Sequence, residues 1–298
     1  MTTTVHKSAT AVEVTRQTLS DPSLTKRSPG EEFAWAVSRD REGGDVVVAL
    51  NGYLPSAFPL FATRPRYTVR HLLKVASVTD RPAAYVREAP EPGRDVPGNT
   101  YASTPESAFG PSVQHAELTD LVIDVAVPKG LVDEPALLAA FVDYRVLVRL
   151  GVVENESLLH GTADGRISGL LTLPELRTGA FGDDVCESLT SAAARVEDTG
   201  GSCDGIVAHP ALYWRLVRDG TLSKLTEVGI KVARTRMMPR GQALLGDFRA
   251  AVTLLDPGVS SLTLRRNAGP EGEDVVRAHA RAGLAVHLPQ HFLLLSRP

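Results

Sequence analysis

The stretch LLHGTADGRISGLL, residues 158–171, decides how this chain is understood. A histidine, glycines and an aspartate form a turn between two apolar runs, which suits a phosphate-binding loop, a catalytic corner or the end of a long helix. A P-loop needs Lys-Ser/Thr after its second glycine, so that lysine and backbone amides reach the phosphates. Here Arg166-Ile167 follows Gly165. We therefore predict that Gly161 ends a helix in a left-handed conformation and that Asp164-Gly165 forms a tight turn.

The segment before this turn has the spacing of a long amphipathic helix. Asp133 is placed to cap it, and Pro135 suits its first turn. A helix of roughly 27 residues reaching residue 160 would extend ~40 Å, which predicts a flat or elongated subunit. The apolar positions that keep helical spacing are Leu137, Leu138, Phe141, Tyr144, Val148 and Val152.

The segment after the turn mixes short helices and strands. Asp183 or Asp184 is placed to cap a helix, CDGIVAHP (203–210) reads as a buried strand, and PALYWRLVRDG (210–220) reads as a helix ended by Gly220. Alternating or apolar runs then predict strands up to the C-terminal region, so the fold class is α+β. These runs are GIKVARTRMM (229–238), QALLGDF (242–248), AAVTLLD (250–256), SSLTLRRN (260–267), DVVRAHARAGLAVHLP (274–289) and HFLLLS (291–296).

The segment before the long helix reads as an arm and an extended hairpin. The first ~28 residues are polar and weakly periodic, which is typical of an arm. Ser28 and Glu31 then form a capping box around Pro29, and Phe33, Trp35 and Val37 are predicted to dock that short helix. Residues 81–115 are rich in proline and glycine with strand-like ends. They are either disordered or a hairpin that lies on another molecule.

Composition excludes several classes of protein. The formal net charge of the 298 residues is −3, which gives no reason to expect tightly bound nucleic acid. Two cysteines and no clustered histidines make a disulfide framework, a metal site or another cofactor site unexpected. No run reaches the ~18–20 apolar residues of a membrane span, and no signal peptide is visible, so we expect a cytoplasmic protein with no membrane partner.

A catalytic interpretation joins Cys186, His160 and Asp184. Cys186 falls on the apolar side of its helix, where a thiol usually serves as a small core group. His209 precedes Pro210 in a strand-to-helix turn and is expected to satisfy backbone groups. The chain has no Gly-x-Ser-x-Gly nucleophile elbow. We therefore expect no enzyme, and a cytosolic cysteine hydrolase stays a remote alternative.

The order of these pieces resembles the major capsid proteins of Hong Kong 97-type bacteriophages, a fold shared with encapsulins. The resemblance covers roughly residues 65–295. It rests on SLLHGTADGRISGLL for the end of the spine helix and on GIVAHPALYWRL for the following strand and helix. GIKVARTRMMPRGQALLGDF and VVRAHARAGLAVHLPQHFLLL match two further segments of the family.

The resemblance implies a division of the chain. Residues 1–64 would form the N-terminal arm with short helices, and residues 65–128 the E-loop region. Residues 129–182 would form the P-domain with its spine helix, residues 183–255 the A-domain, and residues 256–298 the C-terminal P-domain strands. The turn at 158–171 then becomes a hinge between the spine helix and the A-domain side.

The resemblance implies a shell protein that assembles with itself into an icosahedral homo-oligomer. An encapsulin nanocompartment around cargo enzymes is favoured, since no scaffolding-like region precedes the arm and residues 75–128 lack the lysine that some phage shells cross-link. The alternative is a phage or prophage capsid protein that packages DNA in a virion. Tyr101 and Phe109 would make E-loop contacts between subunits, while Asp219, Gly220, Thr221 and Lys224 would line a fivefold pore.

Overall fold

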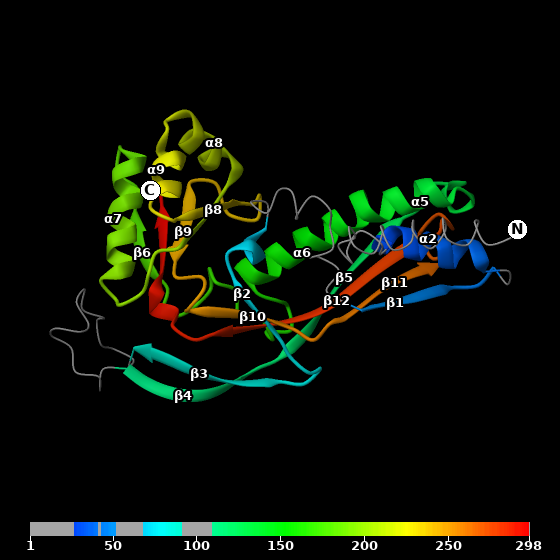
Figure 1. Cartoon of the computed structure of the whole chain (residues 1–298), viewed down its shortest axis with the longest axis horizontal. Helices are drawn as coiled ribbons and strands as arrows, with labels where there is room; N and C mark the ends of the chain where they lie inside the picture. Colours follow the sequence, from blue (N-terminus) through cyan, green and yellow to red (C-terminus); the bar gives the residue numbers. More distant parts are fainter. Residues whose placement is uncertain (1–26, 41–42, 52–67, 91–108, 298) are drawn as a thin grey trace, which may run out of the picture.

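The computed structural model describes residues 27–40, 43–51, 68–90 and 109–297 of the chain. These residues form two packed units and a projecting two-stranded ribbon (Figure 1). One unit is elongated, with a long helix lying along a sheet. The other is compact and surrounds a second sheet. We call them the P-domain and the A-domain, after the division expected from the sequence.

The P-domain sheet has the strand order β1-β11-β12-β10-β2, and β5 pairs with the second edge of β12. Buried and less buried side chains alternate along β11 and along β12 from Val276 to Ala282, which is the pattern of a sheet with one covered face, whereas Val252–Leu255 of β10 are all buried. The strands are β1 (Val46–Asn51), β2 (Lys74–Ser77), β5 (Leu118–Ala126), β10 (Val252–Asp256), β11 (Val259–Arg265) and β12 (Val275–Val286).

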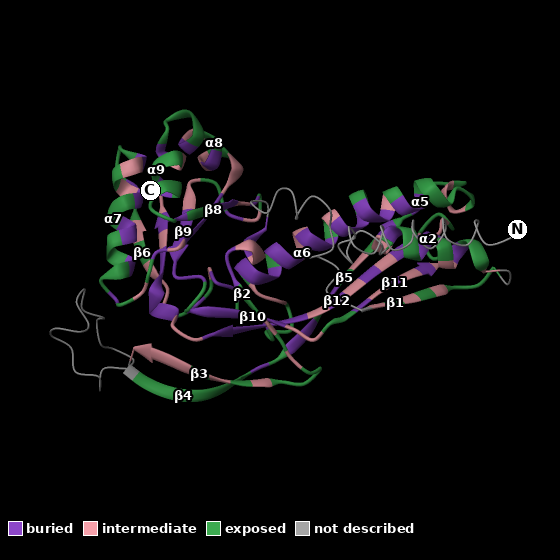
Figure 2. Ribbon diagram, in the orientation of Figure 1, coloured by how far each residue is buried: buried purple, intermediate pink, exposed green. Residues whose placement is uncertain are grey.

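The spine helix covers the face of this sheet that carries its buried side chains (Figure 2). It runs from α5 (Pro135–Phe141) through a π-helical turn (Val142–Val146) into α6 (Leu147–His160). A π turn widens the helix by one residue and shifts the side chains that follow it. The predicted long helix is therefore confirmed, but its N-cap position is Glu134, which makes no capping hydrogen bond, and not Asp133.

The N-terminal helix α2 (Pro29–Arg39) packs against α5. The predicted capping box is present: the Ser28 hydroxyl accepts from the Glu31 amide, and the Glu31 carboxylate accepts from the Ser28 amide. The π turn also presents Asp143 to this end of α2, where the carboxylate accepts hydrogen bonds from the Ser28 hydroxyl and the Gly30 amide. A Cβ at Gly30 would lie 2.2 Å from the Ala139 carbonyl oxygen, so this close approach requires glycine.

The A-domain sheet has the order β6-β13-β9-β7-β8, with α7 (Val185–Glu197), α8 (Pro210–Arg218) and α9 (Thr221–Glu227) packed around it. Asp184 caps α7 and His209 caps α8, as the sequence suggested. Its strands are β6 (Arg177–Ala180), β7 (Gly205–Ala208), β8 (Lys231–Arg234), β9 (Gln242–Gly246) and β13 (Phe292–Ser296).

The two sheets divide the chain at other residues than the domains expected from the sequence. β13 pairs with β6 and β9 in the A-domain sheet, so the C-terminal strands do not all belong to the P-domain. β6 likewise lies before the expected start of the A-domain at residue 183. In the other direction, β10 pairs with β12 and β2 in the P-domain sheet. The chain crosses between the two sheets three times: between β5 and β6, between β9 and β10, and between β12 and β13.

The turn at 158–171, called the hinge turn below, is held by backbone hydrogen bonds. Gly161 has φ 83° and ψ 179°, so it has the positive φ that was predicted but an extended ψ instead of a left-handed helical one. The chain then returns against the helix end, where the amides of Leu170 and Leu171 donate to the carbonyls of Leu158 and Leu159 at 2.9 Å. The returning segment thus satisfies carbonyls that the end of α6 leaves open.

Candidate functional site

The projecting ribbon is the hairpin of β3 (Ala83–Pro90) and β4 (Phe109–Ala116), paired from Ala83↔Ala116 to Pro90↔Phe109. β4 is exposed on both of its faces from residue 110 to residue 115, as Figure 2 shows in green. On the outer face, Val86 and Val113 lie opposite each other and are 57% and 68% exposed. An apolar cross-strand pair this exposed is a candidate contact surface for another molecule.

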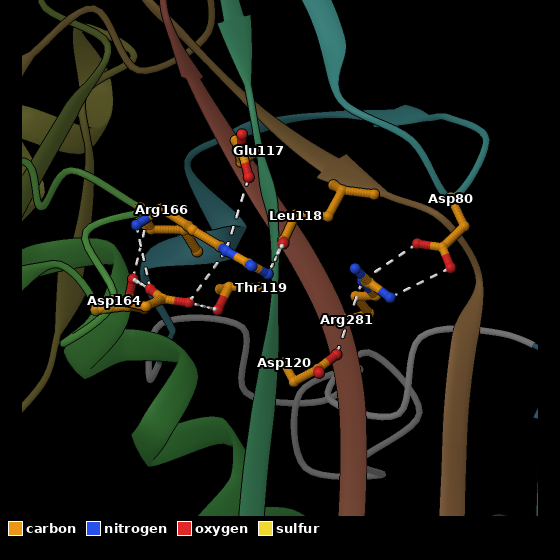
Figure 3. Close-up of polar contacts among 10 residues, drawn as sticks. Asp80, Glu117, Leu118, Thr119, Asp120, Asp164, Arg166 and Arg281 are labelled. Atoms are coloured by element: carbon orange, nitrogen blue, oxygen red, sulfur yellow. Dashed lines mark hydrogen bonds and ion pairs between the residues drawn. The ribbon is translucent and has the colours of Figure 1, made fainter.

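The hinge turn holds the strand by which the hairpin leaves (Figure 3). Asp164 accepts a hydrogen bond from the Thr119 hydroxyl at 2.8 Å. Arg166 donates to the Leu118 carbonyl at 3.3 Å and lies 3.7 Å from the Glu117 carboxylate. The hydroxyls of Thr162 and Thr119, with the Arg166 amide, lower the pKa of Asp164, so it is charged at neutral pH.

The segment that leads from β2 into β3, where the hairpin begins, is held by an arginine of the P-domain sheet. Arg281 on β12 lies 3.2 Å from Asp80, in the link between β2 and β3, and 3.7 Å from Asp120 on β5 (Figure 3). Both ends of the hairpin are therefore fixed by ion pairs. Neither pair is visible in the sequence, because the partners lie far apart along the chain.

The body of the hairpin touches the molecule along one edge of β3. The Glu88 amide donates to the His287 carbonyl at 2.8 Å, and the His287 ring bonds both the Val86 carbonyl, at 3.1 Å, and the Thr253 hydroxyl, at 3.0 Å. Arg87 makes two bonds of 2.8 and 2.7 Å to the carboxylate of Glu175, which precedes β6. A cavity of about 650 Å³ lies beside these contacts, with both Arg87 and Arg166 among its lining residues.

The predicted docking residues of α2 separate into two kinds. Phe33 and Val37 are buried in the core of their own chain, so they dock the helix onto the subunit itself. Trp35 is 41% exposed, and the guanidinium groups of Arg27 and Arg39 lie 4.5 and 4.0 Å from its ring centroid. That stack shields the indole face by cation–π contacts.

The two predicted hairpin contact residues can be placed only in part. Phe109 begins β4, opposite Pro90. Tyr101 lies outside the described residues. Val86 and Val113 are the exposed apolar pair that sequence reasoning did not single out. The alternation in AAYVRE was the available signal, since it puts Tyr85 and Val86 on opposite faces of β3.

The predicted pore loop lies between α8 and α9. Asp219 is ion-paired with Arg215 at 3.4 Å and Arg218 at 3.2 Å. Gly220 has φ 71° and is the N-cap residue before α9, which is consistent with a glycine at a helix boundary. Thr221 is buried and turns its side chain away from the surface, whereas Lys224 is exposed.

The candidate catalytic residues are engaged elsewhere. Asp184 accepts from the amides of Cys186 and Glu187, and the His160 ring bonds the Met237 carbonyl at 2.7 Å. Burial raises the pKa of the second cysteine, Cys203, to about 12, so that thiol is protonated at neutral pH. Over the described part of the chain, no group of three or more His, Cys, Asp or Glu side chains could hold a metal ion, and no helix is long and apolar enough to cross a membrane.

No model of a protein family and no curated protein matches this chain. Solved structures do match. The virus-like particle from Pyrococcus furiosus is 13% identical over 80% of this chain and 95% of that chain, with a TM-score of 0.52. A structure of Microbacterium phage Oxtober96 is 15% identical over 78% and 91% of the two chains, with a TM-score of 0.57. The capsid of a native GTA particle is 14% identical over 78% and 97%, with a TM-score of 0.56. At these identities the likeness establishes a shared fold.

Proposed function

Because the chain has the Hong Kong 97-type capsid fold predicted from its sequence, we propose that it assembles with copies of itself into a closed icosahedral shell. The observation that supports this best is the hairpin. An isolated two-stranded ribbon is marginally stable in water, and this one leaves both faces of β4 and the Val86–Val113 pair uncovered. A neighbouring copy would bury that surface, so the shell would be more stable than the single subunit.

Electron microscopy and analytical ultracentrifugation of the purified chain test this proposal. Closed, uniform particles are expected. Replacing both valines, Val86→Asp with Val113→Asp, should prevent closure by placing unpaired charges at a buried contact. The matched control is Val47→Asp, since Val47 is 68% exposed on the P-domain sheet and lies outside the hairpin. A monodisperse monomer at micromolar concentration would refute shell formation.

We propose further that the shell is an encapsulin compartment holding cargo protein, which makes the role of the chain structural and not catalytic. Supporting it is the absence of lysine from residues 75–128, so this hairpin cannot supply the lysine that some phage shells cross-link. The chain would then act in the cytoplasm.

The alternative is a virion capsid that packages DNA, which is favoured by the likeness to a phage structure and to a GTA capsid. The contents of purified particles separate the two. Co-purified protein with little absorbance at 260 nm supports the compartment, and genome-length nucleic acid supports the virion.

The tip loop of the A-domain is proposed to line the pore at the fivefold axis through Asp219, Gly220 and Lys224. The two arginines beside Asp219 neutralise much of its negative charge. Arg215, Arg218 and Lys224 together outnumber Asp219, so the opening would favour anions. Entry rates of an anionic and a cationic dye into intact particles, compared with those of Lys224→Glu, test this proposal.

A further inference from the structure

The hairpin meets the rest of the molecule through polar contacts along β3 and through a small apolar cluster at its base. Beneath its base lies a small cluster of buried residues, Ala116, Leu118, Leu255 and Ala285, with Tyr85 packed beside it. The polar cavity lies next to this cluster. Such a base provides little hydrophobic resistance to rotation, so ion pairs and hydrogen bonds must fix the angle of the hairpin.

The contacts along β3 come from the two segments by which the chain passes into the A-domain. Glu175 lies in the segment that leads from the hinge turn to β6, and His287 lies in the segment that leads from β12 to β13. Both β6 and β13 belong to the A-domain sheet. The hairpin strands themselves grow from the P-domain, out of β2 and into β5. The hairpin is thus connected in sequence to the P-domain, and its side contacts are made to the segments that lead into the A-domain.

Among the ion pairs that hold the hairpin, the Arg87–Glu175 pair is the shortest and the least exposed. Nη2 of Arg87 donates to both oxygens of the Glu175 carboxylate, and the two side chains are only 19% and 25% exposed. A short, charge-assisted contact that is partly sheltered from water is stronger than a neutral or an exposed one. By comparison, the pair at the hairpin exit, Arg166 with Glu117, is longer and about half exposed.

We infer that the Arg87–Glu175 ion pair is a salt-sensitive latch, which fastens the hairpin to the entrance of the A-domain and whose release lets the hairpin swing over the polar cavity. The inference concerns the chain itself and does not depend on shell formation. If the chain forms shells, the latch sets the angle between the hairpin and the A-domain, and therefore the curvature that neighbouring subunits adopt.

Hydrogen exchange of the full chain, followed by mass spectrometry, tests the latch. Release frees the Glu88 amide from His287 and leaves a two-stranded ribbon that is marginal alone, so amides of both β3 and β4 should exchange faster. Glu175→Gln removes the charge with little change of shape. We expect exchange in residues 83–90 and 109–116 to rise by about threefold to tenfold. In 1 M NaCl, where the screening length is about 3 Å, the wild-type chain should approach the variant.

Arg277→Gln is the matched control. It breaks another short arginine–carboxylate pair, in which Nε and Nη2 of Arg277 donate to the two oxygens of Asp124 at 2.8 and 2.7 Å, at the far end of β5 from the hairpin. The exchange of β3 and β4 should not change in this control. The charge swap Arg87→Glu with Glu175→Arg should restore slow exchange. If the swapped chain does not fold, Glu175→Gln and the salt series still decide the question.

Two results would overturn the latch: unchanged hairpin exchange in Glu175→Gln, or equal acceleration in Arg277→Gln. Fractions of one assembly state, separated by size-exclusion chromatography, are compared throughout. A chain that never assembles would refute the proposed function and still report on the latch. If the wild-type chain assembles but Glu175→Gln does not change the exchange of the hairpin amides, the latch alone is refuted.

Discussion

Asp143 shows how one buried carboxylate can position a helix. It accepts from the Ser28 hydroxyl and the Gly30 amide, yet burial outweighs these bonds and raises its pKa above the ordinary 3.8. A carboxyl whose pKa is higher in the folded chain stabilises the fold most at low pH. That contribution is lost as the pH rises through the folded pKa.

Asp143→Asn should therefore remove a pH dependence and keep the helix docked. The amide oxygen still accepts from Gly30, so we expect the variant to gain free energy of unfolding relative to the wild type as pH rises above 3.8. Asp143→Ala leaves the Gly30 amide without this acceptor and should cost ~1–3 kcal/mol. Urea titrations from pH 3 to 7, followed by tryptophan fluorescence, measure both effects. A difference between Asn and wild type that does not vary with pH would contradict the argument.

Gly161 gives a second test at the scale of single residues. Its φ of 83° with ψ of 179° is a region that only glycine adopts readily, and a Cβ there would lie 2.8 Å from the Ile167 carbonyl. Gly161→Ala should cost about 3 kcal/mol or more. Gly165→Ala is the control, because φ is 71° but nothing lies within 4 Å of its Cβ, and we expect about 1–2 kcal/mol. Equal losses in a thermal or urea titration would show that the hinge has no special geometry.

Helices and strands with strong local signals were predicted from the sequence. Elements that depend on pairing with residues far along the chain were missed. The capping box at Ser28, the cap at Asp184 and the long strand β12 follow from periodicity and end signals. The π turn at 142–146 keeps the same apolar composition as an α-helix, so periodicity alone could not reveal it. β6 and β2 are four residues long and depend on parallel partners far along the chain.

The polar contacts of the hairpin base could not be predicted for the same reason. Arg87 and Glu175, or Asp80 and Arg281, are ordinary surface charges until the fold brings them together. The hairpin itself was one of two interpretations of a segment rich in proline and glycine. Its alternating ends favoured strands, and the ladder from Ala83 to Pro90 confirms them.

A buried ion pair, Glu154 with Arg70, joins the spine helix to the segment before β2. Glu154 on α6 is fully buried and lies 3.5 Å from Arg70, which also lies 3.8 Å from Asp256. Glu154→Ala leaves a largely buried guanidinium without its nearest carboxylate, and we expect a loss of about 3–5 kcal/mol. Asp124→Ala breaks the exposed pair with Arg277 and should cost about 1 kcal/mol or less. Urea unfolding of the two variants in parallel separates the buried pair from the exposed one.

At the scale of the whole molecule, the shape follows from how the chain shares its strands. Four segments leave one sheet for the other or for the hairpin, so neither domain is continuous in sequence. The A-domain sheet takes β13 from the C-terminal region, and the P-domain sheet takes β1 from the N-terminal region. The two sheets thus share strands from distant parts of the chain, whereas β4 of the hairpin is exposed from residue 110 to residue 115 (Figure 2).

The last prediction concerns a variant that lacks residues 91–108, which connect β3 to β4. Pro90 and Phe109 are direct partners in the ladder, so residues 91–108 can be replaced by a two-residue Asn-Gly turn without disturbing β3 or β4. The latch, the hinge and both cores stay intact in this variant. We therefore expect a soluble subunit with unchanged circular dichroism and urea midpoint, because every contact described above for the body and for the two strands is kept. If the hairpin reaches neighbouring copies as proposed, electron microscopy should show no closed particles, and sedimentation should show subunits or small oligomers. Normal particles from the shortened chain would mean that the body alone closes the shell and that the hairpin is not the arm that joins subunits.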